Sequence, residues 1–372
     1  MAGDRVVESV SVRALRNLAD ARVPLQPGIN LVWGPNGAGK TNLLEATYMA
    51  LAGRSCRTRD DRETIAFGGS LARAEATLRT TNDERRTTFL LSVTRTEGKR
   101  QLVDGAPATA DSAAMRPPLS VFMPDRLSLV KGPPSERRNH LDGFCAALWP
   151  ARAELRRRYS RALGQRNALL GRIRAGLAAE GSLDAWDAEL AAAGVELVQT
   201  RREAVDRLVA PFAAAAAALG LELPAALGYR PRSEAAEAES LAAELAERRD
   251  SDLARGYSGW GPHLDELAIE IDDRAARRYG SQGQQRLLLL SLLFAERQAL
   301  IDDGRQPPLM LLDDVTSELD SERRRLLVER LAGGGQALIT ATEPDQLPRI
   351  ADRHEIAMRS GRALAGAGEA AA

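Results

Sequence analysis

The sequence predicts an α/β fold in which both ends of the chain build one core and a helical segment is inserted between them. Strand-like alternation of apolar and polar residues fills the first part of the chain. Apolar residues at helical spacing fill the middle, and short apolar strands return near the end. The simplest division assigns residues 1–142 and 258–372 to the α/β core and residues 143–257 to the helical insertion.

The strand signals of the first part come in two groups. Residues 6–15 and 19–34 alternate as strands do, and a Pro-Gly pair at 27–28 marks a turn inside the second stretch. A meander of further strands is then predicted over residues 63–80, 86–96 and 100–105.

The middle of the chain reads as helix from about residue 143 onward. One apolar stripe at helical spacing runs from Leu155 to Ile173, and a second runs from Leu183 to Leu208 with a potential break at Gly194. Residues 211–231 indicate a helix end and a turn, and residues 233–256 one more helix. Strand signals return at residues 267–273, 307–314 and 336–340, and the last of these is predicted to be the last core strand.

Composition limits the classes of protein that the chain can represent. The apolar content of 44% suffices for a real core, and the formal net charge of zero means that any nucleic-acid surface must be local. The two cysteines and three histidines are scattered, so no zinc site or disulfide framework is indicated. No signal-peptide segment is evident, and the longest apolar run, residues 287–295, is too short to span a bilayer. We therefore expect a soluble, cytoplasmic protein.

The strongest motif lies between a predicted strand and a predicted helix. Gly34, Gly39, Lys40 and Thr41 satisfy the phosphate-loop pattern G-x-x-x-x-G-K-[ST]. Lys40 would neutralise the β- and γ-phosphates and the Thr41 hydroxyl would bind Mg²⁺. All but three of the 51 basic residues are arginine, so a lysine in this slot is itself informative. A chance glycine turn is the alternative. The predicted ATP-binding residues are Gly34, Pro35, Asn36, Gly37, Ala38, Gly39, Lys40, Thr41 and Asn42.

Two acidic residues follow a predicted buried strand, as expected for the partner of a phosphate loop. The strand ending at Leu312 delivers Asp313, whose carboxylate could hold the Mg²⁺ shell. Asp314 comes next and could orient or activate the attacking water, so it joins Lys40 as a candidate catalytic residue. The alternative is a pair of acids at an ordinary strand exit.

A polar loop, Ser281-Gln282-Gly283-Gln284, opens an apolar helix and has two interpretations. Serine is a good N-cap and glycine relieves the turn, so the loop could serve its own helix only. The loop could also contact something outside its own fold.

These motifs, in this order, resemble the ABC-type ATPase heads of the SMC and RecF group. The segment PDRLSLVKGPPSERRNHLD (124–142), the segment GPHLDEL (261–267) and the loop SQGQQR (281–286) narrow the resemblance to the RecF family, over nearly the whole length. The resemblance implies an ABC-type P-loop ATPase head with a helical insertion, and a signature loop (Ser281, Gln282, Gly283 and Gln284) that reads the γ-phosphate on a partner copy.

The family resemblance also implies a function. It implies an ATP-driven homodimer with weak, DNA-stimulated ATPase activity that binds single- and double-stranded DNA at gaps in recombinational repair and replication restart. RecR, and RecO more indirectly, would be partners in loading the RecA recombinase.

The chain departs from the family pattern and from other ABC proteins at four places. Asp314 stands where transporters have Glu, which predicts slow turnover. Thr340 and Thr342 are the only candidates where many ABC proteins carry a histidine. Leu264 and Glu266 replace the Arg and Asp of the family motif, so no role is assigned to that segment.

Arginine clusters are the candidates for DNA contact, although most of them are expected to be solvated, salt-bridged faces. Contacts to phosphate would give affinity without sequence preference. Aromatic residues make up only 4% of the chain, so a base-stacking platform is not indicated. The first candidates are Arg57, Arg59 and Arg62 after the P-loop helix; Lys131, Arg137 and Arg138 come second and could instead hold the nucleotide or the dimer.

Two other classes of protein share parts of this pattern. An ABC transporter ATPase subunit shares the P-loop and signature loop but would lack the arginine-bearing insertion. An SMC-type structural protein shares the head but would carry a heptad coiled coil of hundreds of residues, whereas residues 143–257 show no sustained heptads.

Overall fold

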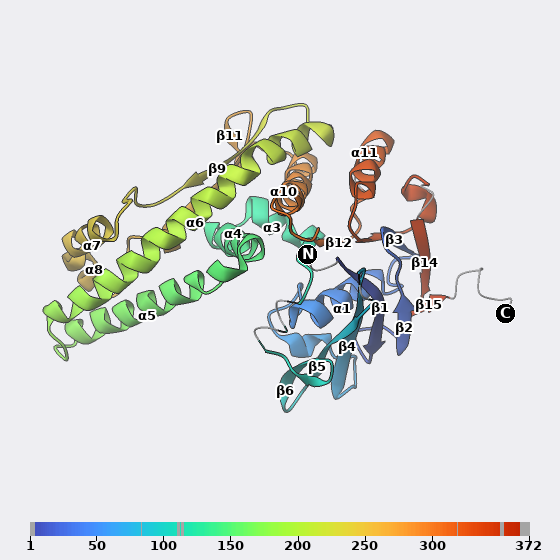
Figure 1. Cartoon of the computed structure of the whole chain (residues 1–372), viewed down its shortest axis with the longest axis horizontal. Helices are drawn as coiled ribbons and strands as arrows, with labels where there is room; N and C mark the ends of the chain where they lie inside the picture. Colours follow the sequence, from blue (N-terminus) through green and yellow to red (C-terminus); the bar gives the residue numbers. More distant parts are fainter. Residues whose placement is uncertain are drawn as a thin grey trace. The chain divides into compact units, whose positions relative to one another are not determined.

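The computed structural model describes residues 4–82, 84–109, 112, 115–317, 319–349 and 353–364. The chain forms two compact units. The first comprises residues 1–126 and 300–372, and the second comprises residues 127–299. The predicted insertion, residues 143–257, is contained in the second unit, which extends beyond it at both ends. An α/β fold is confirmed, with both ends of the chain in one unit (Figure 1).

A mostly parallel six-stranded sheet forms the part of the first unit that positions the site. Its order is β15-β14-β3-β13-β12-β8, and only the β14–β15 pair is antiparallel. The strands β3, β12 and β13 are short and almost fully buried, as is typical of parallel sheets. Their bounds are β3 (Ile29–Trp33), β8 (Leu119–Phe122), β12 (Leu309–Leu312), β13 (Ala337–Ala341), β14 (Arg353–Arg359) and β15 (Arg362–Leu364). Since β3, β12 and β13 are parallel neighbours, the residues that follow them meet at one edge of the sheet.

The expectation that the core ends with the strand at 336–340 was wrong. β14 adds a further parallel strand beside β3, and β15 returns as a hairpin. The Ser360-Gly361 pair is a hairpin-turn signal in the sequence. In the structure both residues have positive φ.

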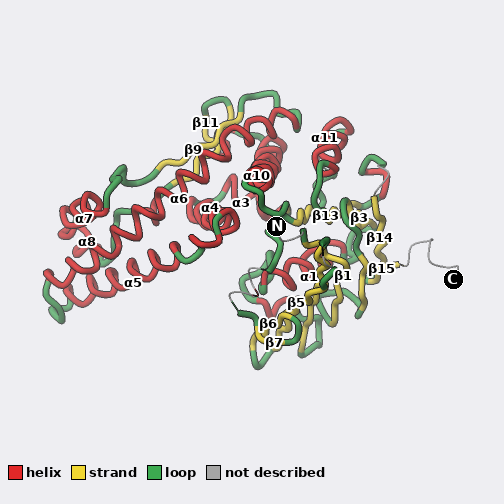
Figure 2. The backbone as a smooth tube through the Cα atoms, viewed as in Figure 1, coloured by secondary structure: helices red, strands yellow, loops and turns green. Residues whose placement is uncertain are grey.

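The predicted meander is a second, antiparallel sheet of the first unit. Its order is β2-β1-β4-β5-β6-β7, and alternate residues of its central strands face the core. The helix α1 (Lys40–Ala52) contacts both sheets, which explains why nine of its residues are buried. Figure 2 shows the two sets of strands around this helix. The remaining bounds are β1 (Arg5–Arg13), β2 (Ala21–Pro24), η1 (Asp61–Thr64), β4 (Leu71–Thr80), β5 (Arg86–Thr94), β6 (Gly98–Val103), β7 (Ala106–Pro107), η2 (Pro124–Leu127), α11 (Ser321–Ala332) and η6 (Pro344–Gln346).

The second unit is mainly helical, and its long helices α5 (Leu155–Arg174) and α6 (Leu183–Ala218) pack side by side (Figure 1). The predicted helix from Leu155 is confirmed as α5, and α6 follows. α6 does not break at Gly194. A Cβ there would lie 2.9 Å from Leu241 Cδ2, so this glycine serves close packing against α7 (Ala238–Glu247).

Two further expectations for the second unit were wrong. Residues 225–230, expected to lie in a turn, form a strand, β9, paired with β10. Residues 233–256, expected to form one helix, form α7 and α8. The remaining bounds are α3 (Ser128–Lys131), α4 (Pro134–Leu148), η3 (Pro150–Arg152), η4 (Glu180–Ser182), β9 (Ala225–Arg230), α7 (Ala238–Glu247), α8 (Arg249–Arg255), η5 (Pro262–Leu264), β10 (Glu266–Ile271), β11 (Arg274–Ala275), α9 (Ala276–Tyr279) and α10 (Gln282–Asp302).

Buried ion pairs hold the second unit together. Arg166 of α5 is fully buried and bonds Asp187 at 2.5 Å and Asp252 at 2.6 Å. Arg201 of α6 bonds Asp142 at 2.8 Å and Asp265 at 3.1 Å. These arginines therefore connect helices of the unit and are not available as a DNA surface.

Candidate functional site

The P-loop lies between β3 and α1 and lines a cavity of about 310 Å³. The loop passes close to the neighbouring strand β14, because a Cβ on Gly34 would lie 2.1 Å from the carbonyl oxygen of Met358. Gly39 caps α1 with φ 101° and without a side-chain hydrogen bond. The first N–H groups of the helix therefore remain available to an anion. The cavity is lined by Asn17, Asn36, Gly37, Ala38, Gly39, Lys40, Thr41, Asn42, Asp313, Asp314, Thr340 and Thr342.

Lys40 is held over the loop that it follows. Its Nζ donates to the carbonyl oxygens of Gly34 at 2.7 Å and Pro35 at 3.1 Å. Partial burial lowers the pKa of Lys40, while the charges of Asp314 and Asp313 oppose that shift. Partial burial disfavours the charged ammonium of Lys40. The negative charge of a phosphate chain would therefore stabilise it.

Asp313 and Thr41 are in direct contact at the wall of the cavity. The Thr41 hydroxyl lies 2.9 Å and 3.0 Å from the two carboxylate oxygens of Asp313. Thr340, on β13, donates to Asp313 Oδ1 at 2.8 Å and accepts a hydrogen bond from the Asp314 N–H at 2.8 Å. Burial raises the pKa of Asp313, and the hydrogen bonds from Thr340 and Thr41 oppose that shift. The structure thus brings the predicted residues Lys40, Thr41, Asp313 and Asp314 to one cavity.

The donor set fits a magnesium ion bound together with phosphate. Thr41 and Asp313 offer only oxygen atoms, and Mg²⁺ is commonly held by one or two carboxylates plus substrate phosphates and water. Among the described residues no cluster of three or more His, Cys, Asp or Glu side chains could bind a metal without such a ligand.

Asn17 is a site residue that sequence reasoning missed. It lies in the loop between β1 and β2, and its Nδ2 donates to the carbonyl of Gly37 in the P-loop at 2.8 Å. Asn42 of α1 donates in turn to Asn17 Oδ1 at 2.7 Å. No local motif surrounds Asn17, so the sequence carries no signal that could have found it.

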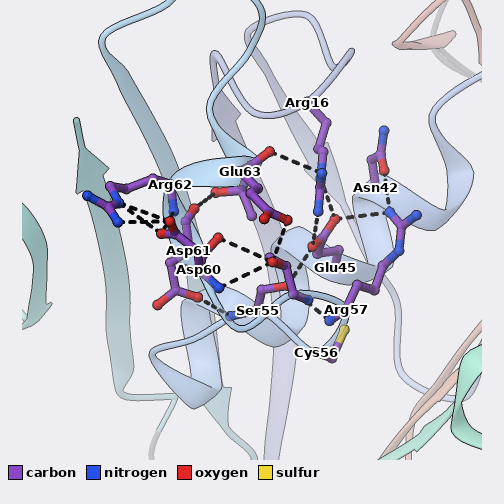
Figure 3. Close-up of polar contacts among 12 residues, drawn as sticks. Arg16, Asn42, Glu45, Ser55, Cys56, Arg57, Asp60, Asp61, Arg62 and Glu63 are labelled. Atoms are coloured by element: carbon purple, nitrogen blue, oxygen red, sulfur yellow. Dashed lines mark hydrogen bonds and ion pairs between the residues drawn. The ribbon is translucent and has the colours of Figure 1, made fainter.

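A buried carboxylate on α1 binds the loop that carries the first DNA candidates (Figure 3). Glu45 is fully buried and accepts from Arg16 at 2.9 and 3.0 Å, from Ser55 at 2.6 Å and from Arg57 at 3.1 Å. Arg57 also donates to Asn42 at 2.9 Å. Arg57 is therefore part of a hydrogen-bonded path that runs through Asn42 and Asn17 to the P-loop.

The other arginines predicted to contact DNA differ in how far they are engaged within the chain. Arg62 bonds Asp60 in its own loop, at 2.9 Å (Figure 3). Arg137 is buried and makes a two-pronged bond to Glu266, at 2.6 and 3.0 Å. Arg138 donates to the carbonyl of Asp265 at 2.7 Å, and burial lowers its pKa. Arg137 therefore has little left to offer a phosphate, whereas Arg138 is engaged through one nitrogen and is only half-buried.

The side chains of Arg59 and Lys131 are exposed, and within the described part of the chain neither has a hydrogen-bond or ion-pair partner. The same holds for Arg54, which sequence reasoning missed although it precedes the 57–62 cluster directly.

The signature loop forms a cap on its own helix. Ser281 N donates to Gln284 Oε1 at 2.8 Å and Gln284 N donates to Ser281 Oγ at 3.2 Å, which is a reciprocal capping box. The capping interpretation is therefore realised for these two residues. Packing within the chain does not require a glycine at position 283, because a Cβ there would meet nothing within 4 Å. Within a helix a glycine costs up to about 1 kcal/mol relative to alanine. A glycine at this position therefore indicates that a ligand comes close to the backbone of the loop.

Comparison with known proteins agrees with this geometry. The family described as RecF/RecN/SMC N terminal domain matches residues 6–363. The DNA replication and repair protein RecF of Deinococcus deserti is 37% identical over 338 residues, which cover 91% of this chain and 90% of that one. The chain belongs to the RecF family of DNA replication and repair proteins.

Solved structures show the same fold for this RecF-family chain. The recombination mediator protein RecF with ATP, from the RecFOR pathway, superposes with a TM-score of 0.84 at 25% identity over 98% of both chains. A Smc head bound to the C-winged helix domain of ScpA gives a TM-score of 0.60 at 16% identity, over 96% of this chain and 95% of that one, and shares the fold alone. Within the described residues, no helix combines the length and apolarity needed to cross a membrane.

Proposed function

We propose that this RecF-family chain binds ATP with Mg²⁺ in the P-loop cavity and uses that binding to control its hold on DNA. The observation that carries the proposal is the pairing of Thr41 with both oxygens of Asp313 directly beside the P-loop. The solved RecF relative that binds ATP has the same fold over nearly its whole length, which supports the choice of nucleotide.

Each residue of the site has a distinct task in this proposal. The N–H groups at the start of α1 and the Lys40 ammonium bind the phosphates, and Thr41 and Asp313 hold the metal. Bound Mg²⁺ would neutralise charge on the β- and γ-phosphates. Asp314 orients the attacking water through its carboxylate. Aspartate is one methylene shorter than glutamate, so a water held by Asp314 lies differently, and we propose weak, DNA-stimulated hydrolysis.

The signature loop completes the site of a second copy in this proposal. Ser281 and Gln284 are occupied with the helix cap, whereas the exposed Gln282 and the unconstrained Gly283 lie at the N-terminal end of α10. A helix N-terminus attracts anions, so this end suits a γ-phosphate on a partner copy. ATP then closes a homodimer, and each copy contributes one loop to the other copy's nucleotide.

DNA contact is proposed for the loop that follows α1 and for Lys131. Arg59 and Arg54 each present a free guanidinium, whereas Arg57 and Arg62 would have to exchange an internal bond for phosphate. The path from Arg57 through Asn42 and Asn17 to the P-loop gives this loop a direct connection to the nucleotide. Action at gaps in single- and double-stranded DNA, with RecR, RecO and RecA as partners, is proposed from the family resemblance.

Two variants test the nucleotide and dimer proposals separately. Lys40→Ala should abolish binding of a fluorescent ATP analogue, because among the described residues no other basic side chain lines the cavity. Ser281→Arg should leave ATP binding by the monomer intact and remove ATP-dependent dimerisation in sedimentation velocity runs. Gln284→Ala, which removes the side-chain hydrogen bond of the cap without adding bulk, is the control and should still dimerise. Normal ATP binding by Lys40→Ala, or a normal dimer in Ser281→Arg, would refute the corresponding assignment.

A further inference from the structure

One fully buried hydroxyl connects the two acidic residues of the site. Thr340 lies on β13, between β3 and β12 in the sheet, and is 0% exposed. Its Oγ1 donates to Asp313 Oδ1 and accepts from the backbone N–H of Asp314, both at 2.8 Å. The first bond holds a carboxylate, and the second holds the backbone of the next residue.

The backbone at Asp314 needs such support. Its φ of 49° lies in the left-handed region, which costs a non-glycine residue about 1 kcal/mol or more. The Ser317 hydroxyl donates to the Asp314 carbonyl at 3.0 Å and holds the peptide on its other side. The left-handed turn is therefore fixed at both its N–H and its C=O, and the direction in which Asp314 leaves the strand follows from it.

A hydroxyl is suited to make both bonds of Thr340 at once. Asp313 requires a donor and the Asp314 N–H requires an acceptor, and a Ser or Thr hydroxyl supplies one of each. Valine has the same shape but neither function. Thr340 borders the cavity but is 0% exposed, and its hydroxyl is already bonded to Asp313 and to the Asp314 N–H, so its role differs from that of a residue that contacts nucleotide.

We propose that Thr340 is the positioning residue of the site: its hydroxyl orients Asp313 toward the metal and fixes the backbone from which Asp314 reaches the water. This inference rests on the proposed function of the same cavity. Ala341, which follows Thr340 on β13, is fully buried and has no polar side chain, so it cannot share the task. The strand β13 thus contributes a buried residue that positions the two acids. The P-loop and the signature loop of a second copy contact the nucleotide.

Three variants test the positioning role. Thr340→Val removes the hydroxyl at nearly constant shape, Thr340→Ser keeps the hydroxyl, and Thr340→Cys keeps the volume with a weaker donor and acceptor. The readout is binding of a fluorescent ATP analogue as Mg²⁺ is titrated, and separately in EDTA. Steady-state kcat and KM for ATP are measured on the same proteins.

Thr340→Val should need at least about tenfold more Mg²⁺ for half-maximal nucleotide binding, because the carboxylate loses a charge-assisted hydrogen bond. Its kcat should fall while nucleotide binding in EDTA stays at the wild-type level. Thr340→Ser should stay close to wild type and Thr340→Cys should lie between the two. If Thr340→Val does not fold, the order of wild type, Ser and Cys in Mg²⁺ dependence still decides the matter.

The positioning role is overturned if the valine variant keeps wild-type Mg²⁺ dependence, or if the serine variant loses as much as the valine variant. Failure of the proposed function would look different, because wild type itself would then show no Mg²⁺-dependent binding of ATP.

Discussion

Replacing the buried Glu45 by Gln should destabilise the first unit by about 2–3 kcal/mol at neutral pH. The carboxylate accepts hydrogen bonds from Arg16, Ser55 and Arg57 and is 0% exposed. Removing one partner of a buried ion pair costs about 3–5 kcal/mol, since the remaining charge is left uncompensated. Arg16 and Arg57 keep 24% and 32% of their side chains exposed, so water can solvate them in part and the cost falls below that range.

The cost of this substitution should depend on pH, with a sign set by the pKa of Glu45. Burial raises that pKa, but the hydrogen bonds from Arg16 and Ser55 outweigh burial, and the pKa lies below its usual value of 4.5. A carboxyl group of this kind contributes stability that is fully present above its unfolded pKa and is lost as the pH falls through its folded pKa. The difference between wild type and Glu45→Gln should therefore be full at pH 7 and shrink below pH 4.5.

Thermal unfolding of the full chain without nucleotide, at pH 7 and at pH 4, measures both effects. For a unit of roughly 200 residues, 2–3 kcal/mol corresponds to a fall in Tm of about 4–12 °C. Glu97→Gln, which alters an exposed carboxylate in the turn between β5 and β6, is the control and should change the free energy of unfolding by less than about 0.5 kcal/mol. A Tm for Glu45→Gln equal to that of the control, or a deficit of the same size at both pH values, would refute this reasoning.

Three further substitutions probe the phosphate loop, the water-orienting acid and the DNA loop. Gly34→Ala should abolish ATP binding, since its Cβ would lie 2.1 Å from the Met358 carbonyl oxygen; Gly164→Ala, on an open face of α5, should bind ATP normally, and titration with a fluorescent analogue compares them. Asp314→Asn should bind ATP and dimerise but stall, so its DNA dissociation in ATP should be much slower than that of wild type; equal lifetimes alongside lost hydrolysis would mean that hydrolysis does not release DNA. Arg59→Ala should lower the slope of log affinity for DNA against log salt by about 0.9, the contribution of one neutralised phosphate. Arg62→Ala, whose guanidinium is already paired with Asp60, should change that slope less, and equal effects of the two would show that the internal pair does not matter.

The parts of the site that the sequence predicts are those whose residues are neighbours in the chain. The P-loop is one continuous segment, so its pattern of glycines, Lys40 and Thr41 identifies it without knowledge of the fold. Asp313 could be assigned because a single buried strand precedes it. The Ser281–Gln284 cap is equally local, since both of its hydrogen bonds span three residues.

The parts that the sequence does not predict depend on contacts between distant segments. Thr340 reaches Asp313 across 27 residues, and Arg16 reaches Glu45 across 29, so neither pair has a local signature. The strand β9 was missed because its sequence AALGYR has no β-branched residue, and pairing with β10 decides its conformation. Gly194 was read as a helix breaker, whereas tertiary packing against Leu241 explains it.

The close approach of β14 to Gly34 has a consequence for how the protein is made. The strand β3, which leads into the P-loop, pairs on one side with β13 and on the other with β14. A ribosome synthesises residues 29–40 long before residues 353–359. The nascent chain therefore carries a complete phosphate-loop sequence before the neighbouring strands β13 and β14 exist. Because contacts of such long sequence separation form slowly, nucleotide affinity should arise only after β14 has been synthesised and has paired with β3.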